Sequence, residues 1–383
     1  MPKVSHPPTR PPRTRRAPLV LALFGAFGGF ASFYLLLSVV PEYALRGGSG
    51  PTGAGLCTGA LMVTTVAIQP VVPRLQSAVG KRVTLVAGGL LLGLPCLALG
   101  LSDRLPALIA LSLLRGCGFG IVVVIGVSAV AELTPEAKWG KGLGLYGAVV
   151  GVAGIIGSPS GLWIVHRAGF DWAFIAGAIA TAAVLVGACG ATETRPATRN
   201  QRAALTGAVR KLAPPFLIEA ASTMAYGIVF TFLPLTVGHA PTWTAPTALF
   251  AVQAACTLSR LLSGTFVDRH GGTALLIPAI ITAAAGMTTA VFPSNPAAVI
   301  AGMAVFGAGF GIIQNASLVV MLHASKDVGV SVGSVAWNLA FDAGTGAGAV
   351  GGGIVLGATD SRTVFLTMTA LLLASIAAVR RRR

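Results

Sequence analysis

Charged residues are scarce in this sequence. Lys, Arg, Asp and Glu make up 10% of its 383 residues, and only 11 positions are acidic. A soluble domain normally carries about 25% charged residues, which keep its surface hydrated. Disordered chains are excluded as well, because they need low hydrophobicity and 54% of this chain is hydrophobic. The shortage of charge therefore argues against a soluble enzyme and favours a protein that sits in a lipid bilayer.

Metal-binding and disulfide patterns are also lacking. The cysteines are Cys57, Cys96, Cys117, Cys189 and Cys256. They lie in apolar segments, their number is odd, and no pair has the spacing CxxC. The five histidines are scattered along the chain and offer no set of ligands with metal-binding spacing. We therefore expect the cysteines to be small core residues, and we expect no metal site and no cofactor.

Long apolar runs are abundant instead. A helix that crosses a bilayer needs about 20 mostly apolar residues, and the chain contains twelve such runs separated by turn or charge signals. They cover residues 17–40, 51–72, 83–101, 106–131, 142–164, 171–190, 213–237, 244–266, 273–292, 296–322, 329–356 and 362–379. The sequence therefore predicts an all-α integral membrane protein with twelve transmembrane helices.

Basic residues indicate how these helices are oriented. The net charge of +16 comes from short basic clusters between the apolar runs, which argues against nucleic acid as a partner. If the N-terminus is cytoplasmic, 21 basic residues lie on the cytoplasmic side and four lie on the other side. Cytoplasmic loops of membrane proteins carry the excess of Lys and Arg. We therefore expect a multi-pass protein of the cell (inner or plasma) membrane with both termini in the cytoplasm.

The longest polar interval divides the chain into two halves. It follows the sixth predicted helix and contains an acid and several basic residues. We predict a basic N-terminal tail at 1–16, a six-helix bundle at 17–190, a cytoplasmic linker at 191–212, a second six-helix bundle at 213–379 and a basic C-terminus at 380–383.

The two halves resemble each other at a constant offset of 191 residues. The alternating glycines of Arg115–Ile121 reappear in Phe306–Ile312, and matches in two further places share the offset. This pattern indicates a duplicated six-helix unit, as in transporters built from two parallel repeats around a site at the bilayer midplane. Ionisable residues do not repeat in this way, because Asp342 stands where the first half has Gly151.

Several motifs give the chain a resemblance to the major facilitator superfamily. Residues 264–271 read GTFVDRHG and fit that family's GxxxDRxG signature on a cytoplasmic loop. Residues 111–120 look like its fourth-helix signature, an arginine followed by spaced glycines. Residues 157–161 read GSPSG and are similar to the fifth-helix signature of its antiporters. The resemblance covers residues 17–380 and implies the two-bundle, twelve-helix fold of that family, in its drug and metabolite exporter branch.

The resemblance also implies residues that take part in conformational change. These expected gating residues are Gly264, Asp268, Arg269, Gly271, Gly80, Arg82, Gly157, Pro159 and Gly161. In the first half, Ser77 and Ala78 stand where the loop signature would have its acid and its arginine. Small residues in membrane helices let their backbones approach closely, which suits helices that rock against one another.

Three charged residues inside predicted helices are candidates for proton coupling. A charge at the bilayer centre costs about 2.5–3.5 kcal/mol on insertion scales, so it normally faces a cavity or a partner. Asp342 lies midway along the eleventh helix, Glu219 lies two turns into the seventh, and Arg115 lies in the outer third of the fourth. Each residue has a structural alternative. Asp342 can be a buried hydrogen-bond acceptor that ties helices together, and Glu219 can be a carboxylate at the membrane interface. Arg115 can be a hydrogen-bond donor that stabilises helix ends. Arg260, near a helix end, is expected to snorkel to the interface.

Polar and aromatic residues inside the helices are candidates for binding a substrate. Amides and tyrosines can bind polar groups of a ligand, and aromatic rings can cover its apolar surface. The candidates are Asn338, Gln314, Asn315, Tyr34, Tyr226, Trp337, Phe33 and Phe230. Each of them can instead belong to the core or face lipid.

Secondary active transport is the function that these features predict. We expect proton-coupled export of a small amphipathic organic molecule by alternating access, because few amides and charges lie in the helices. The alternative is a proton-linked or facilitative uptake carrier for a sugar or another small nutrient. A membrane enzyme or receptor is disfavoured, since the chain has no DxxxD pair on one helix, no GxSxG motif and no output domain. The expected partners are the substrate, protons and bilayer lipids, and the expected state is a monomer.

Overall fold

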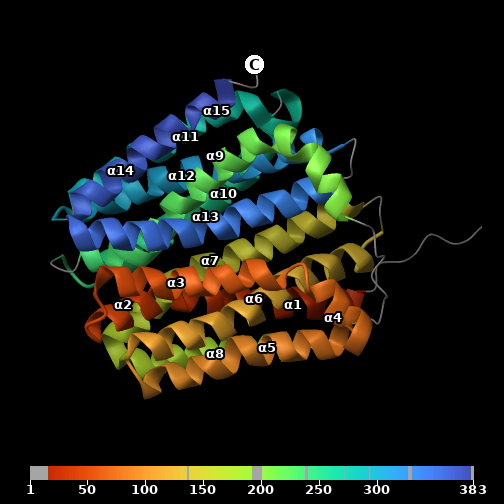
Figure 1. The fold of residues 1–383 in the computed structure, drawn as a ribbon, viewed down its shortest axis with the longest axis horizontal. Coiled ribbons are helices and arrows are strands. Elements are labelled where there is room, and N and C mark those ends of the chain that lie inside the picture. The colour runs from red at the N-terminus through yellow and green to blue at the C-terminus, as the bar shows by residue number, and fades with distance from the viewer. Residues whose placement is uncertain are drawn as a thin grey trace, which may run out of the picture.

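The computed structural model describes residues 16–135, 138–191, 201–237, 240–270, 272–292, 294–326 and 330–380. Within these residues the chain forms helices joined by short turns, without any strand. Twelve helices in the described ranges are long and apolar enough to cross a membrane. They lie side by side and roughly parallel in one bundle (Figure 1). The predicted all-α fold with twelve transmembrane helices is confirmed.

With one exception, the helix bounds follow the predicted apolar runs to within a few residues. The long helices of the first half are α1 (Arg16–Leu37), α3 (Gly50–Ile68), α5 (Lys81–Ala98), α6 (Leu105–Leu133), α7 (Trp139–Ala168) and α8 (Phe170–Ala188). Those of the second half are α9 (Gln201–Thr236), α10 (Thr244–His270), α11 (Gly272–Thr288), α12 (Pro296–Ala324), α13 (Val330–Ala358) and α14 (Ser361–Ala374). Three short helices are α2 (Val39–Arg46), α4 (Val72–Val79) and α15 (Ile376–Arg380). Helix α9 begins inside the predicted linker, so the second part of that linker is helical.

Glycines and capping side chains set several helix ends. Gly80 (φ +87°) separates α4 from α5, and Gly169 (φ +94°) separates α7 from α8. Both backbones have a positive φ, which glycine adopts without steric cost. Asn295 and Asp360 begin α12 and α14, and each side chain accepts a hydrogen bond from the backbone N–H three residues later, at 3.1 and 2.8 Å. These signals confine the turns to a few residues.

The helices of the two halves pack in the same pairs. In the first half α1 contacts α7 and α8, α6 contacts α3 and α5, and α5 contacts α8. In the second half α9 contacts α13 and α14, α12 contacts α10 and α11, and α11 contacts α14. Figure 1 shows the first group, red to yellow-green, below the second group, green to blue. The pairs correspond in chain order, which is what a duplicated six-helix unit predicts.

Close approaches of helix backbones repeat at the same offset. A Cβ atom on Gly118 of α6 would lie 2.6 Å from the carbonyl oxygen of Gly88 in α5. A Cβ atom on Gly309 of α12 would lie 2.6 Å from the carbonyl oxygen of Ala279 in α11. Gly309 and Ala279 both lie 191 positions after their counterparts. The offset seen in the sequence therefore also relates the packing of the two halves.

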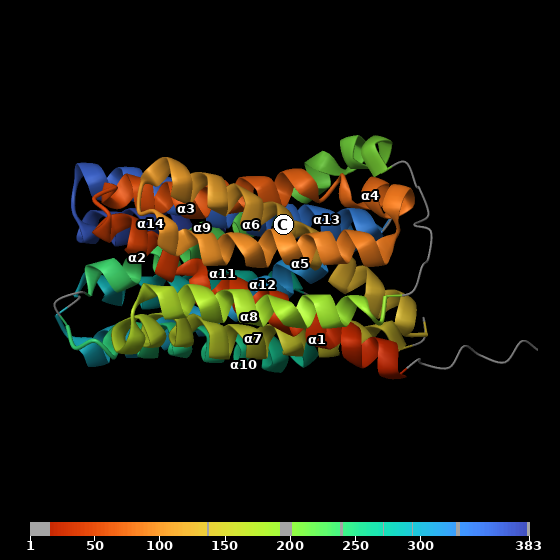
Figure 2. The same ribbon diagram turned by 90° about the horizontal axis from the view of Figure 1, so that it is seen from below.

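Two helix pairs join the halves along their length. Helix α3 packs on α13 and helix α7 packs on α10, at opposite edges of the molecule (Figure 2). A Cβ atom on Gly55 of α3 would clash with the Ala349 carbonyl of α13, and one on Gly154 of α7 would clash with the Gln253 side chain of α10. Small residues thus let both pairs approach closely. The side chains of α1 and α9 meet in the space between the two pairs.

The two ends of the bundle differ in charge. The end where α1 begins carries exposed basic side chains in or beside the turns between the long helices, among them Arg74, Arg82, Lys138 and Lys326. We call this the basic end, and α4 marks it at the right of Figures 1 and 2. The opposite end contains the turns that precede α3, α6, α8, α10, α12 and α14.

Candidate functional site

Asp342 connects the two halves of the molecule. Its Oδ2 atom accepts a 2.6 Å hydrogen bond from the side-chain amide of Gln69, which follows the last residue of α3. Asp342 lies near the middle of α13, and only 6% of its surface is exposed. The carboxylate is therefore buried between the two helix groups. A change in its charge alters a contact that holds one half against the other.

Further hydrogen bonds between the halves lie nearer the opposite end. The Ser38 hydroxyl donates to the Phe230 carbonyl at 2.5 Å, and the Thr52 hydroxyl donates to the Gly353 carbonyl at 3.2 Å. A third contact joins α3 to α9 through two threonine hydroxyls that lie 3.3 Å apart. The halves are thus closed against each other at the opposite end. The hydrogen bond between Gln69 and Asp342 closes them towards the basic end.

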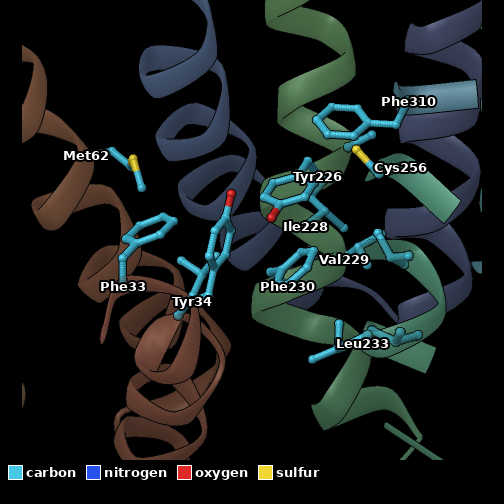
Figure 3. Close-up of a cluster of buried hydrophobic side chains, with 14 of the residues drawn as sticks. Phe33, Tyr34, Met62, Tyr226, Ile228, Val229, Phe230, Leu233, Cys256 and Phe310 are labelled. Carbon is cyan, nitrogen blue, oxygen red and sulfur yellow. The ribbon is translucent and has the colours of Figure 1, made fainter. Parts of the chain in front are cut away.

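Two tyrosines from different halves face each other at the centre. Tyr34 of α1 and Tyr226 of α9 direct their hydroxyl groups towards each other (Figure 3), and the Gln253 amide of α10 lies beside both. Tyr34 is 8% exposed and Tyr226 is 1% exposed. The three side chains bring hydrogen-bond donors and acceptors from both halves to one point. This is the part of the molecule best suited to contact a polar group of a substrate.

Aromatic rings flank this centre on both sides. Phe33 stacks on Phe119 with ring centroids 4.2 Å apart. Tyr226 stacks on Phe230 and on Phe310, at 4.3 and 4.8 Å. Figure 3 shows Phe33 on one side of the centre and Phe230 with Phe310 on the other. All of these rings are buried, so the two halves are closed against each other around the facing tyrosines. Separation of the halves would expose two aromatic walls.

Glu219 is a second buried acid, and it lies inside the second half. Its two carboxylate oxygens accept hydrogen bonds of 2.6 Å from the Gln314 amide and from the Ser317 hydroxyl of α12. Its side chain is fully buried. The Trp337 indole of α13 donates to the Ser317 hydroxyl at 3.1 Å. Three helices, α9, α12 and α13, therefore meet at this carboxylate. Such burial does not fit the alternative of an interfacial acid that reaches towards the loops.

The predicted binding residues Trp337, Asn315 and Asn338 have three different contacts. The guanidinium of Arg260 lies 5.6 Å from the ring centre of Trp337, in a cation–π position. Asn315 donates to the Ser263 hydroxyl of α10 at 3.2 Å. Asn338 donates to a carbonyl of its own helix at 2.9 Å. Trp337, Asn315 and Asn338 are all partly exposed.

Arg115 does not join either acid. Its side chain is 1% exposed, and the buried Nε and Nη2 atoms make no hydrogen bond to any residue that the structure describes. It borders a small cavity together with Ser112 of α6 and Thr58 of α3. The three residues proposed for proton coupling are thus found in three separate environments: between the halves, inside the second half and inside the first half.

The glycines of the predicted fifth-helix motif lie against α1. A Cβ atom on Gly157 would lie 3.0 Å from the Ala31 carbonyl oxygen, and one on Gly161 would clash with the Leu35 carbonyl. Pro159 lies within α7 between these two glycines. The motif therefore allows α7 and α1 to pack with their backbones almost in contact.

The predicted loop motif of the second half is largely helical. Helix α10 continues through Gly264 and ends at His270, so the expectation of a loop over this motif is wrong up to that residue. The prediction failed because helix α10 continues for four residues, about one turn, beyond the apolar run 244–266. Gly264 has open space around it, because a Cβ atom there would have only the Asn315 amide within 4 Å. The side chains of Asp268 and Arg269, and Gly271 itself, lie outside the residues described.

The equivalent turn of the first half contains an ion pair. Gly80 ends α4 and begins α5, and Arg82 is exposed in the first turn of α5. Between them, Lys81 is 1% exposed, and its ammonium group lies 2.5 Å from a carboxylate oxygen of Glu132 at the end of α6. The pair connects two helices at the basic end.

Several residues of the site were not selected from the sequence. Gln69, Gln253 and Ser317 all carry polar side chains in or beside an apolar run, which is the signal that membrane helices offer for a functional or packing contact. Each gains its importance from a partner on a distant helix. Spacing along one helix could not indicate which partner that is.

The fold and the site together define a class of protein. Two helical bundles enclose a centre with tyrosine, glutamine and aromatic side chains, and one buried carboxylate lies between the bundles. In a membrane, such an arrangement suits a carrier that opens its centre to one side at a time.

Comparison with known proteins identifies the family. The model of the Major Facilitator Superfamily matches residues 22–340. The chain is 30% identical over 162 residues to the uncharacterized MFS-type transporter YfiU of Bacillus subtilis (strain 168), covering 42% of this chain and 30% of YfiU. It is 28% identical over 143 residues to the multidrug transporter protein MdtP of the same organism, covering 36% of this chain and 26% of MdtP. These matches span less than a third of the length of the two relatives.

A solved structure supports the same fold. The nucleoside transporter NupG superimposes with a TM-score of 0.75 at 15% sequence identity, over 94% of this chain and 99% of NupG. The chain belongs to the Major Facilitator Superfamily. Its family and its twelve candidate spans make it a multi-pass membrane protein.

Proposed function

We propose that the protein exports a small amphipathic organic molecule, such as a drug or a secondary metabolite, in exchange for protons. The observation that carries this proposal is the buried carboxylate of Asp342, which is bonded across the two halves to Gln69. A proton on this carboxylate removes a charge from the contact between the bundles. The similarity to MdtP, which is named a multidrug transporter, supports export as the direction.

In this mechanism Asp342 links protonation to the movement of the halves. The ionised carboxylate accepts the Gln69 hydrogen bond and holds α3 against α13. Hydrogen bonds to charged groups contribute about 1.5–3 kcal/mol, and neutral ones contribute about 0.5–1.5 kcal/mol. Protonation therefore weakens the contact and favours opening at the basic end. Release of the proton there lets the substrate enter, and closure around the substrate opens the opposite end.

Glu219 and Arg115 are the other proposed coupling residues. Glu219 can hold a second proton, and its charge state affects how α9, α12 and α13 pack around it. Arg115 cannot release its proton under physiological conditions. Its guanidinium therefore stays protonated through the cycle and does not itself carry the transported proton.

The substrate is proposed to bind between the facing tyrosines. Tyr34, Tyr226 and Gln253 contact its polar group, and the rings of Phe33 and Phe230 cover its apolar part after the halves separate. An amphipathic molecule offers both kinds of surface. The other proposed contacts are Trp337, Asn338, Asn315 and Gln314.

The basic end is proposed to face the cytoplasm, with the protein in the cell membrane as a monomer. The exposed basic side chains of that end follow the distribution typical of cytoplasmic loops. The proposed gating elements are the segment 264–271, its first-half counterpart around Gly80 and Arg82, and the glycines of α7. Residues 264–270 at the end of α10, and Gly80 with Arg82, lie at the basic end, where the halves must separate to admit a substrate from the cytoplasm.

Uptake of a small hydroxyl-rich nutrient is the second candidate function. The hydroxyl groups of Tyr34 and Tyr226 and the Gln253 amide can also bind the hydroxyls of a sugar or nucleoside. The likeness to NupG concerns the fold alone. The direction of transport under a proton gradient separates the two candidates.

The test begins with growth inhibition of cells with and without the protein, across a panel of toxic compounds. A compound that the protein protects against is then used as the probe in proteoliposomes under an imposed proton gradient. We expect wild-type protein to accumulate the probe on the more acidic side, and Asp342→Asn to reduce this accumulation at least about tenfold. A tenfold change corresponds to about 1.4 kcal/mol, the size of one charged hydrogen bond.

Asp360→Asn is the matched control, because it removes an acid from an exposed position where asparagine is an equally good helix cap. It should transport like the wild type. Probe movement that ignores the proton gradient and persists in Asp342→Asn would contradict the proposed role of Asp342. Accumulation on the less acidic side would favour the uptake carrier.

A further inference from the structure

Arg115 of α6 has no counter-charge among the residues that the structure describes. Its side chain is 1% exposed, and its Nε and Nη2 donors are buried without a hydrogen-bond acceptor in the described chain. A guanidinium group remains charged at physiological pH. A buried charge without a partner is strongly destabilising. The surroundings of Arg115 therefore favour the binding of an anion.

A small cavity adjoins the guanidinium group. It lies between α1, α2, α3 and α6, and its lining includes Arg115, Ser112 and Thr58. Ser112 precedes Arg115 by three residues and so shares its face of α6. The Ser112 hydroxyl is also buried and has no hydrogen-bond partner among the described residues. Two unsatisfied donor side chains of one helix face thus line the same cavity, whose remaining walls are mostly apolar.

We propose that this cavity binds one small monovalent anion, of the size of chloride, with Arg115 and Ser112 as its ligands. The anion neutralises the guanidinium and accepts hydrogen bonds from Nε, Nη2 and the Ser112 hydroxyl. Charge-assisted hydrogen bonds of this kind are about twice as strong as neutral ones. A neutral water molecule could accept the same hydrogen bonds but would leave the charge uncompensated.

The cavity is separate from the proposed transport site. It has room for a water-sized or halide-sized group, not for an organic substrate. Its Thr58 hydroxyl lies 3.3 Å from the Thr231 hydroxyl of α9, a contact that joins the halves near the opposite end. The bound anion therefore stabilises the first half and the closed opposite end. This inference does not depend on the identity or direction of the transported molecule.

The test uses the purified full-length protein in detergent and chloride as the probe. Sodium chloride replaces sodium gluconate at constant ionic strength, because gluconate is too large for the cavity. We expect Tm to rise with chloride in a saturable way, and radioactive chloride to bind at one ion per chain in equilibrium dialysis. Arg115→Gln should abolish both effects.

Two further variants keep the test informative if Arg115→Gln does not fold. Ser112→Ala removes one neutral ligand and should weaken chloride binding about tenfold, the equivalent of one hydrogen bond to a charged group. Arg167→Gln removes an exposed arginine that lies over the Trp163 ring, and it should leave chloride binding unchanged. The proposal is overturned if wild-type protein binds no chloride, or if Ser112→Ala binds it with wild-type affinity.

Discussion

The two halves of the molecule share their packing and differ in their charges. Glycines at equivalent positions of α6 and α12 admit the neighbouring helices α5 and α11 in the same way. Yet Arg115 of α6 corresponds to Phe306 of α12, and Asp342 of α13 corresponds to Gly151 of α7. Residues that allow close packing therefore repeat, whereas ionisable residues occur once. The duplicated unit determines how the helices pack. The residues that differ between the halves, Arg115 and Asp342, are the candidates for chemistry.

Gly151 and Asp342 illustrate this difference at equivalent interfaces. Gly151 lets α7 approach α10, since a Cβ atom there would lie 2.8 Å from the Thr257 methyl group. Asp342 lies on the equivalent helix of the second half and bonds to Gln69 of the first half. Both positions join the halves, but only the carboxylate can change its charge. Protonation should therefore affect the contact between α3 and α13 and leave the contact between α7 and α10 unchanged.

The largest expected effect tests the equivalence of the halves. Gly118→Ala and Gly309→Ala should each lower the free energy of unfolding by about 3 kcal/mol, because each new Cβ atom meets the backbone of a neighbouring helix. The two losses should be similar in size. Thermal unfolding of the purified variants in detergent measures them.

Gly144→Ala is the control for these two variants. Gly144 lies in α7 with open space around its Cβ position, so alanine should stabilise the protein by up to about 1 kcal/mol through its higher helix propensity. If only one of Gly118→Ala and Gly309→Ala destabilises the protein, the packing of the halves is not equivalent.

A smaller difference between the halves concerns helix caps. Helices α12 and α14 begin at Asn295 and Asp360, whose side chains accept backbone hydrogen bonds. The residues that precede α6 and α8 are Arg104 and Gly169, which lie 191 residues earlier and provide no side-chain cap. At these turns the second half has gained hydrogen bonds that the first half lacks.

Asp360→Ala should lower Tm slightly at neutral pH, and this effect should disappear in strong acid. Hydrogen bonds from Thr363 lower the pKa of Asp360 below its ordinary value of 3.8. The stabilisation is therefore complete above the unfolded-state pKa of about 3.9 and is lost as the pH falls through the lower folded-state pKa. Asn295→Ala should lower Tm by a similar amount at both pH values, because its amide does not titrate. Equal pH responses of the two variants would rule out the carboxylate as the cause.

Much of the fold could be predicted from the sequence because it depends on local patterns. Twelve apolar runs correspond to twelve long helices, since a bilayer fixes the length of a spanning helix. The 191-residue offset was visible because glycine at a helix contact cannot be replaced without displacing the neighbouring helix. The end of α10 was missed, because helical structure can continue beyond the apolar part of a sequence.

The site was harder to predict because it depends on partners that lie far apart in the chain. Gln314 and Asn315 are adjacent polar residues, yet only Gln314 reaches Glu219, because successive side chains point to different faces of a helix. Gln69 gains its role from Asp342, which lies 273 residues later. Lys81 belongs to a basic loop by sequence but is buried against Glu132. Such pairings depend on the packing of the bundles and leave no local pattern.

The central claim is that protonation of Asp342 opens the basic end. Spin labels at exposed Ser77 and Lys326 report the distance between the halves at that end, and labels at exposed Asp103 and Thr359 report the opposite end. For wild-type Asp342, acidification should lengthen the Ser77–Lys326 distance and leave the Asp103–Thr359 distance short. In Asp342→Asn, the Ser77–Lys326 distance should be long at every pH. The claim is contradicted if the wild-type distances do not respond to pH, or if Asp342→Asn responds as the wild type does.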